Sequence, residues 1–359
     1  LLQWYTRHGR HDLPWQIAPT PYRVWVSEIM LQQTQVTTVI PYYQRFMQRF
    51  GDVQALAQAD MDEVLQHWAG LCYYARGRNL HRAAGIIVER YQRQLPHEIE
   101  CLIALPGICR STAAAILALA HGQRHAILDG NVKRSLCRYH AIDGYPGEAR
   151  IQARLWQLAE SHTPHKRVAD YTQAIMDFGA TLCTRSKPSC DQCPQQEDCS
   201  AFEQGKVSDL PTPRPRRKRP SRQCHMLALI ETDSNELLLF KRPESGLWGG
   251  LYSLPEFDSF SACAEGVATY VREAALEPVV HQPIKHAFTH FDLNITPLSC
   301  HLTQTELKKI LDKLRPDNNI LAPMDSKAVF RLPLDAPEAG VGLPVPVQKI
   351  VKALTSHSA

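Results

Sequence analysis

Hydrophobic residues in the first half of the chain recur three and four positions apart, which is the spacing of amphipathic α-helices. Examples are residues 56–68 and 83–91, and the nearly continuous apolar run Ala113–Ala120. That run has fewer than half of the roughly 20 residues needed to cross a bilayer, so it predicts a helix buried in a protein core. The helical pattern continues to about residue 200 and predicts an all-α first domain.

In the second half the hydrophobic period shortens to two, as in β-strands with one buried face. Residues 225–231 and 236–241 predict a pair of strands joined by a polar turn, and residues 291–296 alternate between hydrophobic and polar side chains. Between them, residues 262–276 have helical spacing. These elements predict an α+β second domain.

A proline-rich basic segment separates the two halves. The sequence PTPRPRRKRPSRQ at 211–223 contains four prolines and six basic residues, a composition that cannot form a packed core. We expect an extended linker at 208–223, between a helical domain at 1–207 and the α+β domain at 224–359. The basic run is either a solvated hinge or also lies along a phosphate backbone.

Composition narrows the class of protein. Hydrophobic residues make up 44% of the chain and charged residues 21%, which excludes collagen-like, disordered and disulfide-scaffold proteins. The net charge of +4 permits a polyanionic partner but does not require one. The chain opens at Leu1 with no basic segment leading into an apolar one, so we expect no signal peptide and an intracellular location.

Four of the eleven cysteines lie within seventeen residues, in the pattern C-x6-C-x2-C-x5-C. Four thiolates in one short loop can hold a zinc ion or a [4Fe–4S] cluster, because both need a tetrad of charged sulfur ligands. The spacing alone leaves the two open. The predicted ligands are Cys183, Cys190, Cys193 and Cys199.

The sequence Leu-Pro-Gly-Ile-Cys at 105–109 lies between two predicted helices, of which the second begins near Ser111. Together, residues of about 98–120 resemble the helix-hairpin-helix of DNA repair glycosylases. In that motif a tight turn, here containing Gly107 and Cys109, points backbone N–H groups at a DNA phosphate. Residues 125–132 then resemble the aspartate-containing loop of the helix-hairpin-helix/GPD superfamily.

Two further features resemble the MutY family of adenine glycosylases. The stretch VWVSEIMLQQTQV at 24–36 is similar to a MutY motif and surrounds Glu28 with apolar neighbours, which favours the protonated form that an acid catalyst needs. Ser111 stands where endonuclease III-like enzymes carry a Schiff-base lysine, and a hydroxyl cannot form an imine. The second domain resembles the MutT-like domain of MutY.

The resemblance implies a monofunctional enzyme that removes adenine mispaired with 8-oxoguanine or guanine, and one [4Fe–4S] cluster. Glu28 would protonate the adenine at N7, while ionised Asp129 stabilises or attacks the sugar oxocarbenium ion. Asn131 would orient Asp129 or a water, and Ser111 would line the same pocket. Asp129 is also a candidate N-cap of the following helix, and both roles can coexist.

Excision requires the adenine to leave the base stack. The resemblance gives Gln33 and Tyr73 the role of wedge, aided by Leu31; a buried core position is the alternative for Tyr73. The same motifs imply further residues that line the DNA and adenine site: Trp15, Gln16, Thr34, Leu71 and Cys72.

In the second domain, Phe288-Thr289-His290 resembles the Phe-Ser-His loop that recognises 8-oxoguanine. The Nudix motif at 272–277 lacks an acidic residue and has no preceding G-x5-E, so we expect this domain to hydrolyse nothing.

Cys72 and Cys109 depart from the family, which has glycine at both positions. A side chain there costs clearance or roughly 1 kcal/mol of backbone strain. Two alternatives to the adenine glycosylase therefore stay open: an endonuclease III-like glycosylase/lyase, and a mispair-binding protein with impaired turnover. In each case we expect double-stranded DNA as the partner, a monomer, no membrane contact and a location in the cytoplasm at the bacterial nucleoid.

Overall fold

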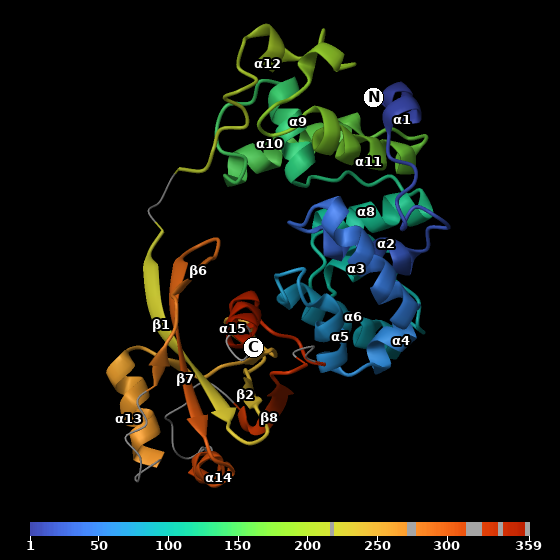
Figure 1. Ribbon diagram of the computed structural model, residues 1–359. Helices are drawn as coiled ribbons and strands as arrows, with labels where there is room; N and C mark the ends of the chain where they lie inside the picture. The colour runs from blue at the N-terminus through green and yellow to red at the C-terminus, as the bar shows by residue number, and fades with distance from the viewer. Residues whose placement is uncertain (216–218, 271–277, 314–324, 337–339, 356–359) are drawn as a thin grey trace. The chain divides into compact units, whose positions relative to one another are not determined.

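The computed structural model describes residues 1–359 apart from 216–218, 271–277, 314–324, 337–339 and 356–359 (Figure 1). The chain divides into two compact units. The first consists of Leu1–Ala59 and Asn79–Arg216, and the second of Asp60–Arg78 and Arg217–Ala359. Within the described ranges, no helix is long and apolar enough to cross a membrane.

The chain before the linker is helical, as its hydrophobic spacing predicts. Its described helices are α1 (Leu2–His8), α2 (Pro21–Leu31), α3 (Val36–Arg49), α4 (Val53–Gln58), α5 (Met61–Trp68), α6 (Ala75–Arg90), α7 (Ile99–Ile103), α8 (Arg110–His121), α9 (Gly130–Tyr139), α10 (Ala149–His162), α11 (Val168–Asp177) and α12 (Ser200–Glu203), with a π-helical turn η1 (Phe178–Leu182) and a 3₁₀ turn η2 (Cys190–Gln192).

Helix α8 is the centre of the first unit. Its residues from Thr112 to Ala118 are all buried, and the helix packs against α2 and α11. This confirms that the apolar run is a core helix. Helix α8 ends where Gly122 adopts a left-handed conformation, since glycine reaches it without a Cβ clash.

The hairpin between α7 and α8 requires glycine at its turn. Gly107 has φ +80°, and a Cβ built there would lie 2.9 Å from Cβ of Asn79. Both the backbone conformation and the close packing therefore exclude larger residues. Helix α8 begins at Arg110, one residue before the predicted start.

The second unit is built on a mixed sheet. Its described strands are β1 (Ser221–Glu231), β2 (Glu236–Lys241), β3 (Tyr252–Ser253), β4 (Glu256–Phe257), β5 (Val279–Val280), β6 (Ile284–Ala287), β7 (Asp292–Leu302) and β8 (Asp325–Pro333), and its described helices after the linker are α13 (Phe260–Tyr270), α14 (Gln304–Lys313) and α15 (Val345–Thr355).

Strands β1 and β7 form the centre of this sheet and run parallel, in register from the Ser221–Asp292 pair to the Glu231–Leu302 pair. The other strand pairs are antiparallel. Helix α15 covers one apolar face, and α13 and α14 cover the other (Figure 1). The fold is thus the predicted α+β arrangement.

Three details differ from the sequence-based expectation. Strand β1 begins at Ser221, inside the segment assigned to the linker, because residues 221–223 pair with β7. Helix α13 begins two residues early, and the degenerate Nudix motif at 272–277 lies outside the described residues. The second unit also includes the Asp60–Arg78 segment, where Tyr74 Oη donates to the carbonyl of Leu343 at 3.1 Å.

Candidate active site

Glu28 is the eighth residue of α2 and lies among the buried residues Val24, Trp25 and Ile29. The side chain keeps some access to solvent, but the protein around it is dense enough that burial raises its pKa to about 8, with the negative charge of Asp129 adding to the effect. A carboxylic acid with this pKa holds its proton at pH 7. The influence of Asp129 also places the two carboxyl groups within electrostatic reach of each other.

Asp129 is the N-cap of α9. Its side chain accepts a hydrogen bond from the backbone N–H of Val132 at 2.8 Å, which confirms the capping role. Burial raises the pKa of Asp129, but hydrogen bonds from backbone N–H groups and the positive charges of Arg134 and Lys133 act in the opposite direction. Helix α9 thus supplies donors that favour the ionised form of Asp129.

Ser111 and Asn131 lie beside this pair. Oγ of Ser111 accepts a hydrogen bond from the N–H of Leu128, the residue before Asp129, at 3.0 Å. Oδ1 of Asn131 accepts a hydrogen bond from Arg134 at 2.8 Å. The four predicted catalytic residues therefore gather where the start of α8, the start of α9 and the middle of α2 meet.

Two supporting residues were not predicted from the sequence. Arg134 also donates to the carbonyls of Gly179 and Cys183, at 2.6 and 2.9 Å. A Cβ on Gly179 would lie 2.6 Å from Cβ of Asn131, so this glycine lets η1 approach α9 closely. The i, i+3 spacing of Asn131 and Arg134 is the sequence signal that could have identified Arg134. No local sequence pattern marks Gly179.

Gln33 and Tyr73, the predicted wedge residues, share a backbone property. Each is exposed and has a positive φ, 57° for Gln33 and 47° for Tyr73. Residues other than glycine rarely adopt this conformation, and those that do cluster at functional sites. Tyr73 is 45% exposed, so the core alternative for this residue is wrong. Leu31 and Thr34, on either side of Gln33, are partly buried.

Trp15 and Leu71 are buried instead of lining a surface. Trp15 is 4% exposed and packs edge-on against Tyr43, and Leu71 is 2% exposed. Side chains buried to this extent do not support a direct contact with DNA. Instead, both anchor their loops from the core. Gln16 is partly exposed, and its side chain accepts a hydrogen bond from the N–H of Leu13 at 3.3 Å.

The two cysteines at family glycine positions differ in backbone strain. Cys72 is exposed with φ 60°, so its Cβ carries the expected cost. Cys109 has φ −89° and ψ 168°, an extended conformation open to any residue. Of the two expected costs, backbone strain therefore applies to Cys72 and not to Cys109, where clearance is the one that is left.

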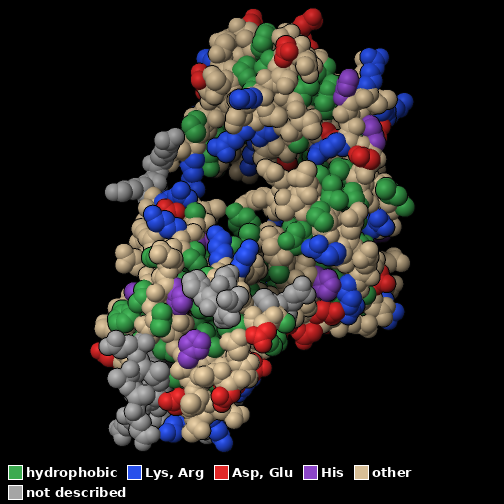
Figure 2. Space-filling view, viewed as in Figure 1, with side chains coloured by type: hydrophobic (Ala, Val, Ile, Leu, Met, Phe, Trp, Pro, Cys, Tyr) green, Lys and Arg blue, Asp and Glu red, His purple; other side chains and the backbone are tan. Residues whose placement is uncertain are grey.

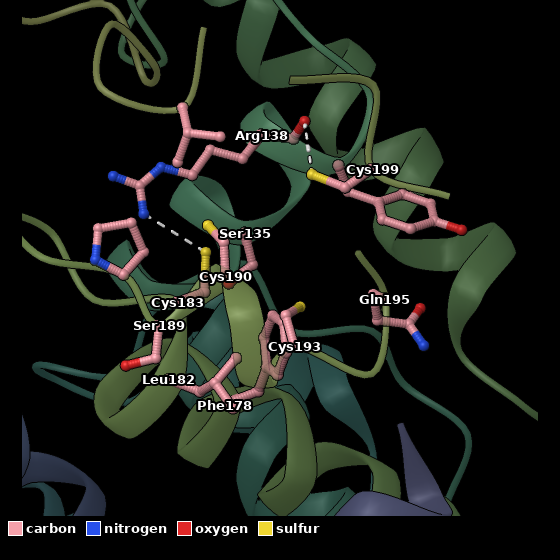
Figure 3. Close-up of a pocket in the computed structure, with 13 residues that line it drawn as sticks. Ser135, Arg138, Phe178, Leu182, Cys183, Ser189, Cys190, Cys193, Gln195 and Cys199 are labelled. Atoms are coloured by element: carbon pink, nitrogen blue, oxygen red, sulfur yellow. Dashed lines mark hydrogen bonds between the residues drawn. The ribbon is translucent and has the colours of Figure 1, made fainter. Parts of the chain in front are cut away.

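The four clustered cysteines line one pocket (Figure 3). Each stands at the end or start of a short element, because the chain turns sharply around the pocket. The residues that line it include no carboxylate, and Arg138 donates to Sγ of Cys183 at 3.4 Å. Burial, with the neighbouring thiols adding to it, raises the pKa of Cys193 to about 11.

This donor set fits a soft metal centre, since the sulfur atoms repel one another as thiolates unless a cation or cluster lies between them. In the described part of the chain, however, no three His, Cys, Asp or Glu side chains are arranged to hold a metal ion. The structure therefore brings the four cysteine side chains to one pocket, and the [4Fe–4S] cluster stays a prediction.

The Phe288-Thr289-His290 segment forms the turn between β6 and β7, closed by a hydrogen bond from the N–H of Phe288 to the carbonyl of Phe291 at 2.9 Å. Phe288 is partly buried and stacks on Phe291, with ring centroids 4.6 Å apart. Thr289 and His290 are exposed. The turn thus presents a hydroxyl and an imidazole on an aromatic base. Each of the two units carries Lys and Arg side chains on its surface (Figure 2), which suits a polyanionic partner.

Comparison with known proteins agrees with this fold. Residues 26–161 match the model of the HhH-GPD superfamily of base excision DNA repair proteins, and residues 225–353 match the NUDIX domain. A solved thermostable thymine-DNA glycosylase aligns with a TM-score of 0.52 and 27% identity, over 56% of this chain and 93% of that one. The first part of the chain is thus a helix-hairpin-helix repair glycosylase in fold.

Relatives that align with most of the chain show which kind of glycosylase it is. The adenine DNA glycosylase of Buchnera aphidicola subsp. Schizaphis graminum is 38% identical over 303 residues, which cover 84% of this chain and 87% of the relative. That of Buchnera aphidicola subsp. Acyrthosiphon pisum is 35% identical over 98% of this chain and 95% of its own, and the human enzyme is 37% identical over 71% and 56%. The chain belongs to the adenine DNA glycosylase family, the N-glycosylases of base excision repair.

Proposed function

We propose that this protein removes adenine from A·8-oxoguanine and A·guanine mispairs in DNA as a monofunctional glycosylase. The observation that carries the proposal is the pair of unlike carboxyl groups, Glu28 and Asp129. Burial holds the proton on Glu28, while the first turn of α9 provides N–H donors to Asp129. Burial acts on both carboxyl groups, but of the two only Asp129 receives N–H donors from the described residues, and neighbouring groups that differ in this way suit an acid and an anion that act on one substrate.

Breaking the glycosidic bond has two chemical obstacles, and Glu28 and Asp129 each overcome one of them. Adenine is a poor leaving group as an anion, so Glu28 transfers its proton to N7 of the extruded base as the glycosidic bond breaks. The sugar becomes an oxocarbenium ion, which the negative charge of Asp129 stabilises until water adds at the anomeric carbon and gives its proton to the Glu28 carboxylate. Asn131, held by Arg134 at 2.8 Å, keeps an amide directed at Asp129 or at that water.

The product is an abasic site with an intact strand. Strand cleavage by a lyase step needs an amine that forms an imine with the opened sugar. Ser111 occupies the relevant position and already accepts the N–H of Leu128, so it contributes to the geometry of the pocket instead of to covalent chemistry.

Recognition of the opposite base falls to the Phe288-Thr289-His290 turn, whose hydroxyl and imidazole can hydrogen-bond the edge of 8-oxoguanine. The four cysteines would hold one [4Fe–4S] cluster, which supplies a covalent cross-link for the 183–199 loop. Arg138, which contacts Cys183 and the carbonyls of Thr184 and Arg185, orders that loop from the α9 side.

The test is a single-turnover assay on a duplex with adenine opposite 8-oxoguanine, with the enzyme in excess and alkali to reveal abasic sites. We expect adenine release by the wild type and a loss of at least about 10²-fold in Glu28→Gln. Undiminished release by Glu28→Gln contradicts the proposal. Visible absorbance near the charge-transfer bands of iron–sulfide centres, lost in Cys193→Ser, checks the cofactor; a colourless protein that contains zinc contradicts the cluster.

A further inference from the structure

The loop at 69–74, between α5 and α6, contains two consecutive residues in the left-handed region. Cys72 has φ 60° and Tyr73 has φ 47°. This conformation is costly for any residue with a Cβ, so surrounding contacts have to maintain it. Tyr73 is 45% exposed, whereas Leu71, two positions earlier, is 2% exposed. The loop therefore projects one aromatic side chain outward from a buried base.

Arg76, the second residue of α6, contacts this loop through hydrogen bonds and ring contacts. It is 9% exposed, and its Nη2 donates to the carbonyls of Leu71 and Cys72 at 2.9 and 3.2 Å. Trp68 Nε1 donates to the same Cys72 carbonyl at 3.3 Å. The carbonyl of the strained Cys72 thus receives two hydrogen bonds, one of them from a charged donor.

The guanidinium also contacts the two aromatic rings of the loop. Its Cζ lies 5.6 Å from the ring centroid of Trp68 and 5.5 Å from that of Tyr73, both within the range of cation–π attraction. Burial lowers the pKa of Arg76 to about 10, which leaves the group charged at neutral pH. The same side chain therefore fixes the backbone before Tyr73 and contacts the Tyr73 ring itself.

We propose that Arg76 is a positioning residue for base extrusion: it holds the 71–73 backbone in the conformation that presents Tyr73 to the DNA stack. The inference rests on the proposed function, in which Tyr73 is the wedge. It adds that this chain depends on Arg76 because residue 72 is cysteine. Glycine would adopt φ near 60° without help, whereas cysteine needs the hydrogen bonds from Arg76 and Trp68 to offset its strain.

Lysine cannot replace Arg76 in this role. An ammonium group is a compact charge, without the planar fork that reaches two carbonyls while a flat face lies against a ring. Arg76→Lys thus keeps the charge and removes the geometry. Arg90→Lys is the matched control, because Arg90 is exposed at the far end of the same helix.

The experiment measures extrusion separately from chemistry. A duplex carries 2-aminopurine next to the target adenine, and its fluorescence rises when the target leaves the stack; the Glu28→Gln background prevents excision during the measurement. The same substitutions are then made with Glu28 intact, and the single-turnover rate of adenine release is measured. Melting temperatures confirm that each variant is folded.

We expect Arg76→Lys to reduce both the fluorescence change and the rate about tenfold relative to Arg90→Lys. In a Tyr73→Ala background Arg76→Lys should cause no further loss, and adding Cys72→Gly should restore Arg76→Lys to within about twofold of its parent. If Arg76→Lys unfolds the protein, Trp68→Phe, which removes the other donor to Cys72, should show a smaller loss with the same rescue.

A loss of equal size in the Tyr73→Ala background, or no rescue by Cys72→Gly, would overturn the inference. Failure of the wild type to release adenine from any mispair counts against the proposed function instead, because the fluorescence measurement on bound DNA still tests the loop. If Tyr73→Ala leaves extrusion unchanged, the wedge and the inference about Arg76 are both wrong.

Discussion

The protonation state of Glu28 sets the expected pH dependence of adenine release. Burial and Asp129 raise the pKa of Glu28 from the ordinary 4.5 to about 8. A group with that pKa is about 90% protonated at pH 7 and about 10% at pH 9, whereas an unshifted glutamate would be about 0.3% protonated at pH 7. We therefore expect the rate to fall about tenfold between pH 7 and pH 9.

The assay is the single-turnover rate of adenine release from an A·guanine duplex between pH 6 and pH 10, with enzyme in excess at every pH. The base opposite the adenine is guanine instead of 8-oxoguanine, because guanine ionises at a higher pH than 8-oxoguanine does. DNA binding measured across the same range separates chemistry from affinity. Glu28→Gln is the matched control, since its residual rate should lack this descending limb.

A rate that already falls about tenfold per pH unit from pH 6 upward, as an unshifted glutamate would produce, would refute the reasoning. A rate that stays constant to pH 10 in the wild type would do the same, because no protonated Glu28 is then required. A descending limb that persists unchanged in Glu28→Gln would assign the titration to another group.

Three further substitutions, and the pH dependence of stability in Glu28→Gln, test the arrangement around this pair. Asp129→Asn keeps an oxygen that can cap α9, so we expect a melting temperature close to the wild type but a rate lower by about 10²- to 10³-fold; equal losses of stability and activity would mean that Asp129 acts only as a cap. Wild-type protein should form no borohydride-trapped adduct with an abasic duplex, while Ser111→Lys should form one on a denaturing gel; an adduct formed by the wild type would restore the lyase alternative. Gly179→Ala pushes a Cβ to 2.6 Å from that of Asn131, so stability should fall by about 1–3 kcal/mol in denaturant unfolding and the rate by about tenfold; a neutral effect would show that η1 shifts freely. Because the folded-state pKa of Glu28 lies above its ordinary value, the favourable protonated state is lost as the pH rises through 8; Glu28→Gln should therefore stabilise the protein more at pH 9 than at pH 6 in thermal melting, and an equal effect at both would contradict the shift.

Much of the fold could be predicted from the sequence because one-sided burial leaves a period in the chain. In β7, Leu293 and Ile295 are buried while Asp292 and Asn294 are more exposed, as the alternation indicates. The apolar run in α8 is buried from Ala113 to Ala118 for the same reason. The end of the linker was harder, since Ser221–Gln223 are polar and exposed residues that join β1 through backbone pairing alone.

A site residue could be predicted where its neighbours in the sequence determine its protonation state. Glu28 on an apolar helix face is such a case, and its raised pKa follows from local burial. Trp15 illustrates the limit, because a motif names a position without saying whether the side chain faces DNA or the core. Gly179 and Arg76 were missed because their importance comes from contacts with Asn131 and with the backbone of Leu71 and Cys72, which only the folded chain brings together.

The overlap between the linker and β1 has a practical consequence for isolating the second domain. Arg219 donates to the carbonyl of Phe288 at 3.3 Å, and the guanidinium of Arg222 lies 4.6 Å from the ring centroid of Phe291. A fragment cut at residue 224 would lack both arginines and the first three rungs of the ladder between β1 and β7. Its lesion-reading turn would lose support from one side, so a fragment intended to bind 8-oxoguanine by itself has to start at or before Arg219.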